Sequence, residues 1–233
     1  MPLFEIREHD RAYYETRLRN FLPDRFIDIH THIWRAADLD RMDSGAARSV
    51  TWPSRVAADN PIDDLMETYR LLFPGKDVTP LVFATIGTET STARMNRYVE
   101  QVTRERGVPA LYFSSPDESA ETLEAAIRAG GFLGVKSYLS YAPAYIPEKE
   151  IRILDFFPPH QLEMLNRNGY IMMLHIPRSG RLKDPVNLAQ LRLINDRYPN
   201  IRTIVAHVGR AYCVDDIGDG MKVLAECGNL FVD

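Results

Sequence analysis

Short apolar runs rich in β-branched and aromatic residues alternate with helical stretches along the chain. Seven of these runs have the length and composition of strands: Arg25 to His30, Leu81 to Ile86, Ala110 to Phe113, Gly134 to Leu139, Tyr170 to His175, Arg202 to His207 and Asn229 to Asp233. Strands that alternate with helices are typical of parallel βαβ units. The pattern therefore predicts an α/β fold with parallel strands.

Two of the intervening helices are predicted from their first residues. Asn60-Pro61-Ile62-Asp63 places a capping residue before a proline at the first helical position. Ser115-Pro116-Asp117-Glu118 has the same form, with Glu118 placed to complete a capping box. We expect Gly130 to end this second helix, because a residue without Cβ readily adopts the left-handed conformation. A further helix is expected from about Glu5 to Asn20.

The chain contains no internal repeat and no linker, which predicts a single domain over residues 1–233. Its longest irregular segment runs from Ile33 to Asn60, directly after the first strand. Loops at the carboxyl ends of barrel strands build active sites, so we expect this segment to cover a substrate rather than to separate domains. Trp34 and Trp52 lie in it, and each either walls a pocket or fills local core.

The composition is that of an ordinary globular protein, with 45% hydrophobic and 26% charged residues. A formal net charge of −4 and a pI near 5.9 argue against nucleic acid as a partner. No segment has the apolar run of a signal peptide or a membrane span, so we expect a cytoplasmic protein with no membrane partner. A homo-oligomer stays open. Cys213 and Cys227 are expected to be reduced thiols, with one disulfide as the alternative.

Four of the six histidines stand at the carboxyl ends of predicted strands: His30, His32, His175 and His207. His30 and His32 are two residues apart, so on an extended chain their side chains point to the same side, about 7 Å apart along the strand. Any single histidine is more often exposed or satisfied by a local hydrogen bond. Four at strand ends favour a shared metal site, because ligands from different strands of a parallel barrel converge at its mouth.

The segment Ile27-Asp28-Ile29-His30-Thr31-His32 resembles the first-strand His-X-His signature of the amidohydrolase superfamily. Leu174-His175 and Ala206-His207-Val208-Gly209 resemble the histidines of its fifth and sixth strands, and the order agrees over nearly the whole chain. The sequence is most similar to the branch called amidohydrolase family 2, which contains lactonases, decarboxylases and hydratases as well as hydrolases. The resemblance implies a TIM-type (β/α)8 barrel and a metal-dependent enzyme.

The resemblance also implies a role for each matching histidine. His30, His32 and His175 would bind a divalent metal ion, and His207 would bind a second metal or hold the attacking water or the substrate. Imidazole nitrogens suit Zn²⁺, the expected cofactor, although Mn²⁺, Fe²⁺ or Ni²⁺ accept the same donors. The metal would lower the pKa of bound water and polarise a carbonyl, as hydrolysis of a lactone, amide or ester requires.

Lys136 lies in the fourth predicted strand, within Gly134-Val135-Lys136-Ser137. Some members of the superfamily carry a carbamylated lysine there that bridges two metal ions, whereas others use a lysine only to hold the substrate. A lysine that faces a barrel interior must find a partner or lose its charge, because burial of an unpaired ammonium is costly. We therefore expect a catalytic role for Lys136 near the histidines, and both ways of acting stay open.

Cationic side chains follow the fifth and sixth predicted strands. A guanidinium binds a carboxylate with paired hydrogen bonds, so these side chains together favour a small anionic substrate. For any one arginine, a solvated loop position is the alternative. The expected substrate-binding residues are Arg178, Arg181, Arg210, Tyr212 and Trp34.

The family's final metal ligand is an aspartate at the end of the eighth strand, and the sequence shows only about seven strands. Asp233 ends the seventh candidate and stands too early to match that aspartate. Two interpretations follow: a C-terminally incomplete barrel from a longer enzyme, or a shortened barrel with altered chemistry. The first predicts a gap between the first and seventh strands and little or no activity.

Three other functions fit parts of the pattern. A metal-dependent lyase, such as a decarboxylase or hydratase, uses the same ligands as a hydrolase. A deoxyribonuclease of the TatD kind also begins with His-X-His, but it carries an acidic third or fourth strand and a basic surface that this sequence lacks. A non-catalytic, metabolite-binding barrel would not need four histidines at strand ends. Metal-dependent hydrolysis of a small carboxylate-bearing metabolite is therefore the preferred prediction.

Overall fold

The computed structural model describes residues 3–40 and 56–233. These residues fold into two compact units, the first made of residues 3–40 and 56–109 and the second of residues 110–233. Parallel strands joined by helices make up both units, which is the α/β organisation that the alternating pattern predicts.

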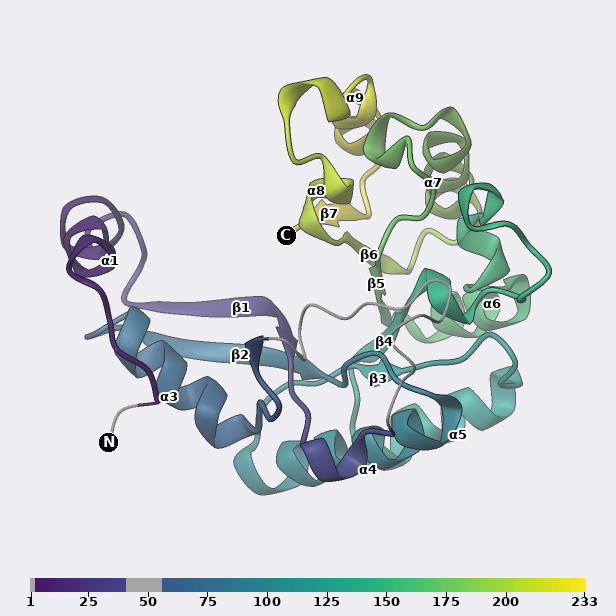
Figure 1. The fold of residues 1–233 in the computed structure, drawn as a ribbon. Helices are drawn as coiled ribbons and strands as arrows, with labels where there is room; N and C mark the ends of the chain where they lie inside the picture. The colour runs from purple at the N-terminus through teal and green to yellow at the C-terminus, as the bar shows by residue number, and fades with distance from the viewer. Residues whose placement is uncertain (1–2, 41–55) are drawn as a thin grey trace. The chain divides into compact units, whose positions relative to one another are not determined.

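The first unit is built around a two-stranded parallel sheet in which β1 pairs with β2 (Figure 1). Arg25 lies opposite Asp77, and the register shifts between Asp28 and Thr31, so β1 contains a β-bulge. The elements are helix α1 (Glu8–Tyr13) with its π-helical continuation η1 (Tyr14–Leu18), β1 (Arg25–His32), the 3₁₀ turn η2 (Ala36–Asp38), α3 (Ile62–Leu72), β2 (Asp77–Phe83) and α4 (Glu89–Arg106).

The second unit contains a five-stranded parallel sheet in the order β3-β4-β5-β6-β7. Its strands are β3 (Tyr112–Phe113), β4 (Gly134–Ser137), β5 (Ile171–Leu174), β6 (Arg202–Val205) and β7 (Leu230–Val232). Its helices and turns are α5 (Ala120–Gly130), η3 (Leu139–Tyr141), η4 (Glu148–Glu150), η5 (Ile153–Asp155), α6 (Pro159–Asn168), η6 (Arg181–Lys183), α7 (Pro185–Arg197), α8 (His207–Arg210), η7 (Val214–Asp216) and α9 (Gly220–Glu226).

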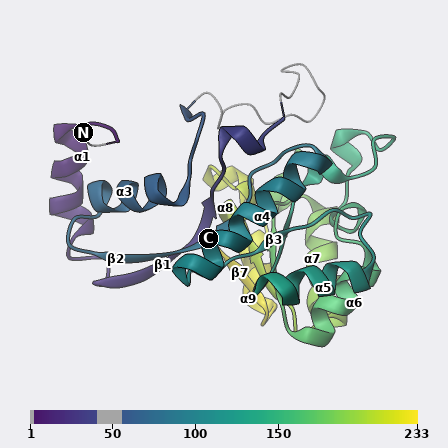
Figure 2. The ribbon, with the colours of Figure 1, turned by 90° about the horizontal axis from the view of Figure 1, so that it is seen from below.

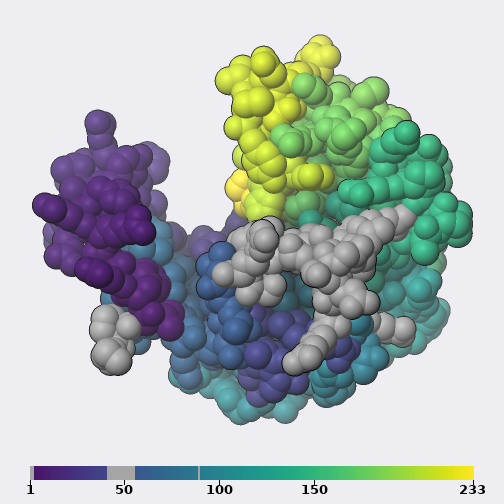
Figure 3. All heavy atoms as spheres, viewed as in Figure 1, coloured from purple at the N-terminus to yellow at the C-terminus, as the bar shows by residue number. Residues whose placement is uncertain are grey.

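The helices of the second unit connect neighbouring parallel strands, as crossovers must (Figures 1 and 2). Helix α5 packs beside α6, and α7 packs beside α9. In the space-filling view the yellow atoms near the C-terminus lie against green atoms of the preceding segment (Figure 3), and the contacts join α9 to α7 and both α8 and η7 to η6. The strands bury apolar side chains such as Val135, Met172, Leu174 and Val205 completely, so the carboxyl ends of the strands rest on a rigid core.

Each of the seven predicted strands has a counterpart among the described residues, with shifted ends. The second strand differs most, because it begins at Asp77 and ends at Phe83 rather than running from Leu81 to Ile86. The helix predicted near the N-terminus is present as α1 and η1.

The predicted helix starts are wrong in their details. Helix α3 begins at Ile62 with Pro61 in the capping position, and the Asn60 amide instead donates to the carbonyl of His32 at 2.7 Å. Helix α5 begins at Ala120 and is capped by Ser119, four residues after the predicted cap, although Glu118 does reach back to accept from the backbone N–H of Ser115 at 2.7 Å as predicted. At its other end Gly130 is the last helical residue and Gly131, at φ 67°, adopts the left-handed conformation.

Three further expectations from the sequence concern the long segment after β1, the two cysteines and membrane-spanning helices. Trp52 lies outside them, as does most of the long segment after β1 that was expected to cover a substrate. Cys213, which is exposed, and Cys227, which is buried, are both free thiols. Within residues 3–40 and 56–233, no helix is long and apolar enough to cross a membrane.

Candidate metal centre

The residues predicted to bind a metal are divided between the two units. In the first unit, His30 and His32 lie at the end of β1 with their ring centres 5.5 Å apart. Both rings meet the edge or face of Phe83 at the end of β2. Two imidazoles that ligate one ion through nitrogens at about 2.1 Å have ring centres about 5 Å apart, so the observed pair fits one cation.

The tautomer of His32 is fixed by its neighbour on the next strand. Nδ1 of His32 lies 2.8 Å from the carbonyl oxygen of Ala84, directly after β2. A carbonyl only accepts hydrogen bonds, so Nδ1 carries the proton and Nε2 keeps its lone pair. This is the arrangement by which proteins orient a metal-binding histidine, and the donor set therefore fits a divalent cation.

The β-bulge in β1 determines where His30 points. The backbone N–H of His30 leaves the sheet ladder and donates to Oδ1 of Asp28 at 3.2 Å. The other oxygen of that carboxylate accepts a hydrogen bond from the Tyr69 hydroxyl at 3.0 Å. Burial and the charge of Asp28 raise the pKa of Tyr69, which keeps the hydroxyl protonated as a donor. Tyr69 on α3 thus holds Asp28, and Asp28 holds the bulge.

In the second unit, His175 and His207 follow β5 and β6, and their ring centres are 5.5 Å apart. His175 is buried, and its ring stacks against Tyr138 with the centres 4.4 Å apart. Tyr138 follows β4, so three consecutive strands deliver these rings to one edge of the sheet. The strand-end placement predicted for both histidines is confirmed within this unit.

His207 opens a turn with an unusual backbone. His207, Val208, Gly209 and Arg210 have φ of 54°, 47°, 63° and 59°, a left-handed run that costs each non-glycine residue about 1–2 kcal/mol. Elsewhere in the described part of the chain, only Arg178 and Arg181 among non-glycine residues have positive φ. Backbone strain of this kind persists where the surroundings enforce it and is concentrated at functional sites. The loops after β5 and β6 carry it here.

Leu182 in η6 enforces the turn. Its side chain is fully buried, and it occupies the space beside Gly209 and Gly220. A Cβ on Gly209 would lie 2.9 Å from Leu182, and one on Gly220 would lie 2.3 Å from it. Leu182 therefore locks the loop after β5 against the loop after β6 and α9.

Lys136 is buried in β4, with 1% of its surface exposed. Burial lowers its pKa from 10.5 to about 7, an effect that the charge of Asp233 opposes. Asp233 also accepts a hydrogen bond from the backbone N–H of His207 and lies 3.8 Å from its Nδ1. Asp233 stands at a strand end like the histidines, and this placement is the feature of the sequence that could have indicated a role for it.

The predicted arginines have different surroundings. Arg178 donates to Asp184, the residue that caps α7, at 3.0 Å. Arg181 pairs with Asp216 at 2.7 Å and lies over the ring of Tyr212, 4.8 Å from its centre. Arg210 forms no ion pair with any described residue, and its buried Nε has no hydrogen-bonding partner among them.

Trp34 is buried in the first unit. Its indole N–H donates to the carbonyl of Ala58 at 3.1 Å, and its backbone pairs with Asn60. Of the two readings of this side chain, these contacts agree with local core. Tyr212 is 66% exposed beneath Arg181. Sequence reasoning gave no role to Asp28, Tyr69 or Tyr138, because their contacts join distant parts of the chain.

The chain matches the model of one protein family, that of the amidohydrolases, over residues 27–233. It belongs to the amidohydrolase family. The resemblance predicted from the strand-end histidines is thereby confirmed. Family membership supports a hydrolase on an α/β scaffold and does not identify its substrate.

Solved structures show the same fold. The amidohydrolase is similar to a crystal structure of an amidohydrolase II, with 14% identity, a TM-score of 0.51, and coverage of 89% of this chain and 77% of that one. It is equally similar to a Staphylococcus aureus protein assigned as an amidohydrolase, with 12% identity, a TM-score of 0.51 and coverage of 89% and 78%. At such identities the likeness shows the fold alone. No curated protein matches the sequence.

Proposed function

We propose that the protein is a metal-dependent hydrolase that opens a lactone, amide or ester bond in a small carboxylate-bearing metabolite. The observation that carries the proposal is the pair of imidazoles at the end of β1, whose ring centres lie 5.5 Å apart and of which His32 is oriented by its Nδ1 contact with the Ala84 carbonyl. Family membership supports the same chemistry on a (β/α)8 barrel scaffold.

The proposed metal ligands are His30 and His32 of the first unit and His175 of the second. Three imidazoles are a ligand set of catalytic zinc sites, so Zn²⁺ is the proposed cofactor. A divalent cation there supplies two things, a lower pKa for coordinated water and polarisation of the carbonyl to be attacked. The protein's own contribution is to fix the three rings, through Ala84 for His32, the Asp28 bulge for His30 and Tyr138 for His175.

His207 and Lys136 are the proposed catalytic residues. A lysine whose pKa is about 7 is partly neutral at physiological pH, so its amine can take a proton from the attacking water and return it to the leaving group. The carboxylate of Asp233 favours the ammonium that forms in between. The Asp233 carboxylate also holds the backbone of His207, which leaves the imidazole to contact the substrate or the water.

The proposed substrate-binding residues are Arg178, Arg181, Arg210 and Tyr212, because the contacts of Trp34 place its ring in the local core of the first unit. They do not contribute equally, because the guanidinium groups of Arg178 and Arg181 already have carboxylate partners. A cation with a partner inside the protein has less to gain from a substrate carboxylate than one without. Arg210 is therefore the strongest candidate of the three arginines.

The test combines metal content with hydrolysis. Protein stripped with a chelator and reloaded with Zn²⁺ should bind at least one ion per chain, and any hydrolysis of a panel of carboxylated lactones, esters and amides should require that ion. His32→Gln should lose the metal, whereas His9→Gln should keep it, because His9 is exposed on α1 beside Asp10. Release of CO₂ without hydrolysis would favour the lyase, and a wild-type chain that binds no Zn²⁺ would reject both.

A further inference from the structure

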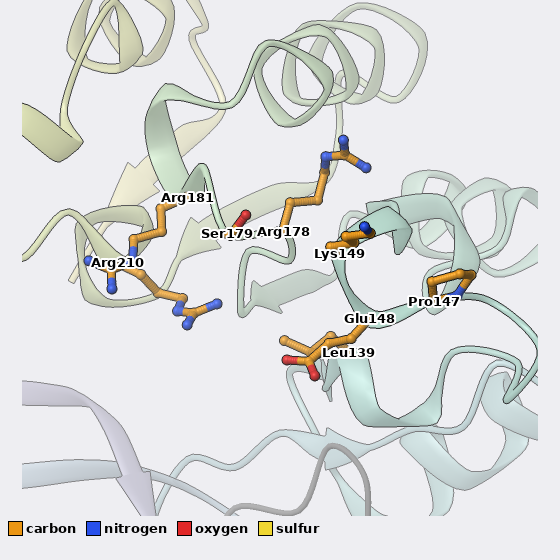
Figure 4. A pocket seen from close by; sticks show the side chains of 8 residues that line it. All are labelled: Leu139, Pro147, Glu148, Lys149, Arg178, Ser179, Arg181 and Arg210. Carbon is orange, nitrogen blue, oxygen red and sulfur yellow. The ribbon is translucent and has the colours of Figure 1, made fainter.

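A pocket of about 500 Å³ opens in the second unit between the loops that follow β4, β5 and β6. Leu139, Pro147, Glu148 and Lys149 line one side, and Ser179, Arg178, Arg181 and Arg210 line the other (Figure 4). The pocket is the right size for a small molecule, and charged side chains dominate its walls.

Only one of the three arginines points its charge into this space. Figure 4 shows the guanidinium of Arg178 turned away from the pocket, where it meets Asp184, and that of Arg210 reaching into it. The Nε of Arg210 is buried with no hydrogen-bonding partner in residues 3–40 and 56–233. None of the described carboxylates pairs with this guanidinium, so its terminal nitrogens, which reach into the pocket, can bind a ligand carboxylate with paired hydrogen bonds.

Glu148 stands across the pocket from Arg210. Its carboxylate points toward the Arg210 side in Figure 4, yet the two groups form no ion pair with each other or with other described residues. Opposite charges that face each other at a distance are suited to a ligand that carries an acceptor at one end and a donor at the other.

Tyr138 connects this pocket with the proposed metal ligand. Its ring stacks on His175, and the next residue, Leu139, lines the pocket. Burial raises the pKa of Tyr138, an effect that the charge of Arg210 opposes. The pocket and His175 are thus linked through the consecutive residues Leu139 and Tyr138.

We infer that this pocket binds an acid whose carboxylate pairs with Arg210 and whose neighbouring hydroxyl or amino group donates to Glu148. This inference rests on the proposed function and narrows its substrate class to hydroxy-acid or amino-acid derivatives. Lys149, beside Glu148, gives the pocket a net positive charge, which favours ligands that carry more carboxylate than ammonium. The bond to be hydrolysed would then lie on the Tyr138 side.

Three four-carbon acids test the inference, since they differ only at C2: succinate carries hydrogen, malate a hydroxyl and aspartate an ammonium. Binding to the metal-free chain of residues 1–233 is measured by ligand-observed NMR titration, so that a carboxylate cannot bind through zinc. Malate and aspartate should bind roughly tenfold more tightly than succinate, as expected for one added hydrogen bond to a charged group.

Two variants separate the two ends of the ligand. Arg210→Gln should weaken all three acids by roughly tenfold or more, because each presents a carboxylate. Glu148→Gln should remove most of the advantage of aspartate but less of that of malate, since a side-chain amide still accepts from a hydroxyl. Arg202→Gln and Glu163→Gln, which change exposed side chains outside the pocket, are the matched controls. Circular dichroism melting confirms that each variant is folded.

The inference is overturned if no acid binds at millimolar concentration, if succinate equals malate and aspartate, or if Arg210→Gln changes nothing. Its failure is distinguishable from that of the proposed function. Zinc-dependent hydrolysis without the C2 preference would reject the pocket and keep the enzyme, whereas the preference in a chain that neither binds zinc nor hydrolyses would keep the pocket alone.

Discussion

A single hydroxyl group on α3 illustrates how far the arrangement of a candidate metal ligand depends on residues that bind no metal. Tyr69 donates to Asp28, and Asp28 accepts the backbone N–H that the bulge of β1 frees at His30. A bulge inserts one extra residue into a strand and re-aims the side chains beside it. The imidazole of His30 therefore takes its direction from a chain of two hydrogen bonds.

Replacing Tyr69 by phenylalanine should weaken zinc binding while leaving the ring packing of α3 intact. We expect the dissociation constant for Zn²⁺ to rise roughly tenfold, as is typical when a group that orients a ligand is lost. Competition against a chromophoric chelator measures it. Tyr98→Phe is the matched control, because Tyr98 is also buried and its hydroxyl accepts from Ile62, away from β1. Equal zinc affinities in the two variants would show that the Tyr69 bond is merely structural.

At the scale of elements, the loops after β5 and β6 act as one unit. Leu182 sits against two glycines, and Asn187 of α7 donates to the carbonyls of Pro177 and Arg181, so the first loop is fixed from both sides. The second loop is then forced into its left-handed turn, which sets the direction of Arg210.

Gly209→Ala should therefore destabilise the protein. The new methyl group would lie 2.9 Å from Leu182, at a φ of +63° that side chains rarely adopt. Overpacking and the left-handed backbone together should cost about 2–5 kcal/mol. Urea unfolding measures this, with Gly228→Ala as control, because nothing lies within 4 Å of the added atom there. A change as small as that of the control would mean that Leu182 does not lock the turn.

Contacts between elements explain which strands and helix starts the sequence pattern predicted correctly and which it did not. All strands were predictable because their apolar runs are local in the sequence. The first residue of a helix, in contrast, depends on hydrogen bonds with residues that are distant in the sequence. The side-chain amide of Asn60 is oriented by its hydrogen bond to the His32 carbonyl, and α3 begins at Ile62 with Pro61 in the capping position. The turn that begins at Ser115 is held by Gln161 of α6, which donates to the carbonyls of Ser115 and Glu118. No local pattern contains these partners.

For the molecule as a whole, the candidate site was predictable in its residue types and not in its electrostatics. Histidines at strand ends can be found in the sequence, because the pattern of apolar residues predicts the strands and each histidine stands at the end of one. Which arginine lacks a partner depends on Asp184 and Asp216, which only the fold brings to Arg178 and Arg181. The depressed pKa of Lys136 likewise reflects complete burial, a property of the assembled sheet.

Buried Lys136 should make the stability of the whole protein depend on pH. In the unfolded chain its pKa is about 10.4, and in the folded chain it is about 7. Between these values the unfolded state binds more protons, so the free energy of unfolding rises with pH from about 7 to about 10. Below about pH 7 the amine is protonated in both states, and the folded protein bears the full cost of a buried ammonium.

Comparison with Lys136→Met isolates this contribution, because other titrating groups cancel in the difference between the two proteins. Urea unfolding of the metal-free chains should show that the variant is more stable than the wild type near about pH 7. The difference in the free energy of unfolding should become smaller toward about pH 9, because Lys136 loses its proton in the folded wild type at a lower pH than in the unfolded chain. Methionine keeps the length of the side chain and removes its charge, so packing changes little. A gap that stays constant over this range would mean that Lys136 remains charged in the folded protein, and the proton-transfer role proposed for it would have to be given up.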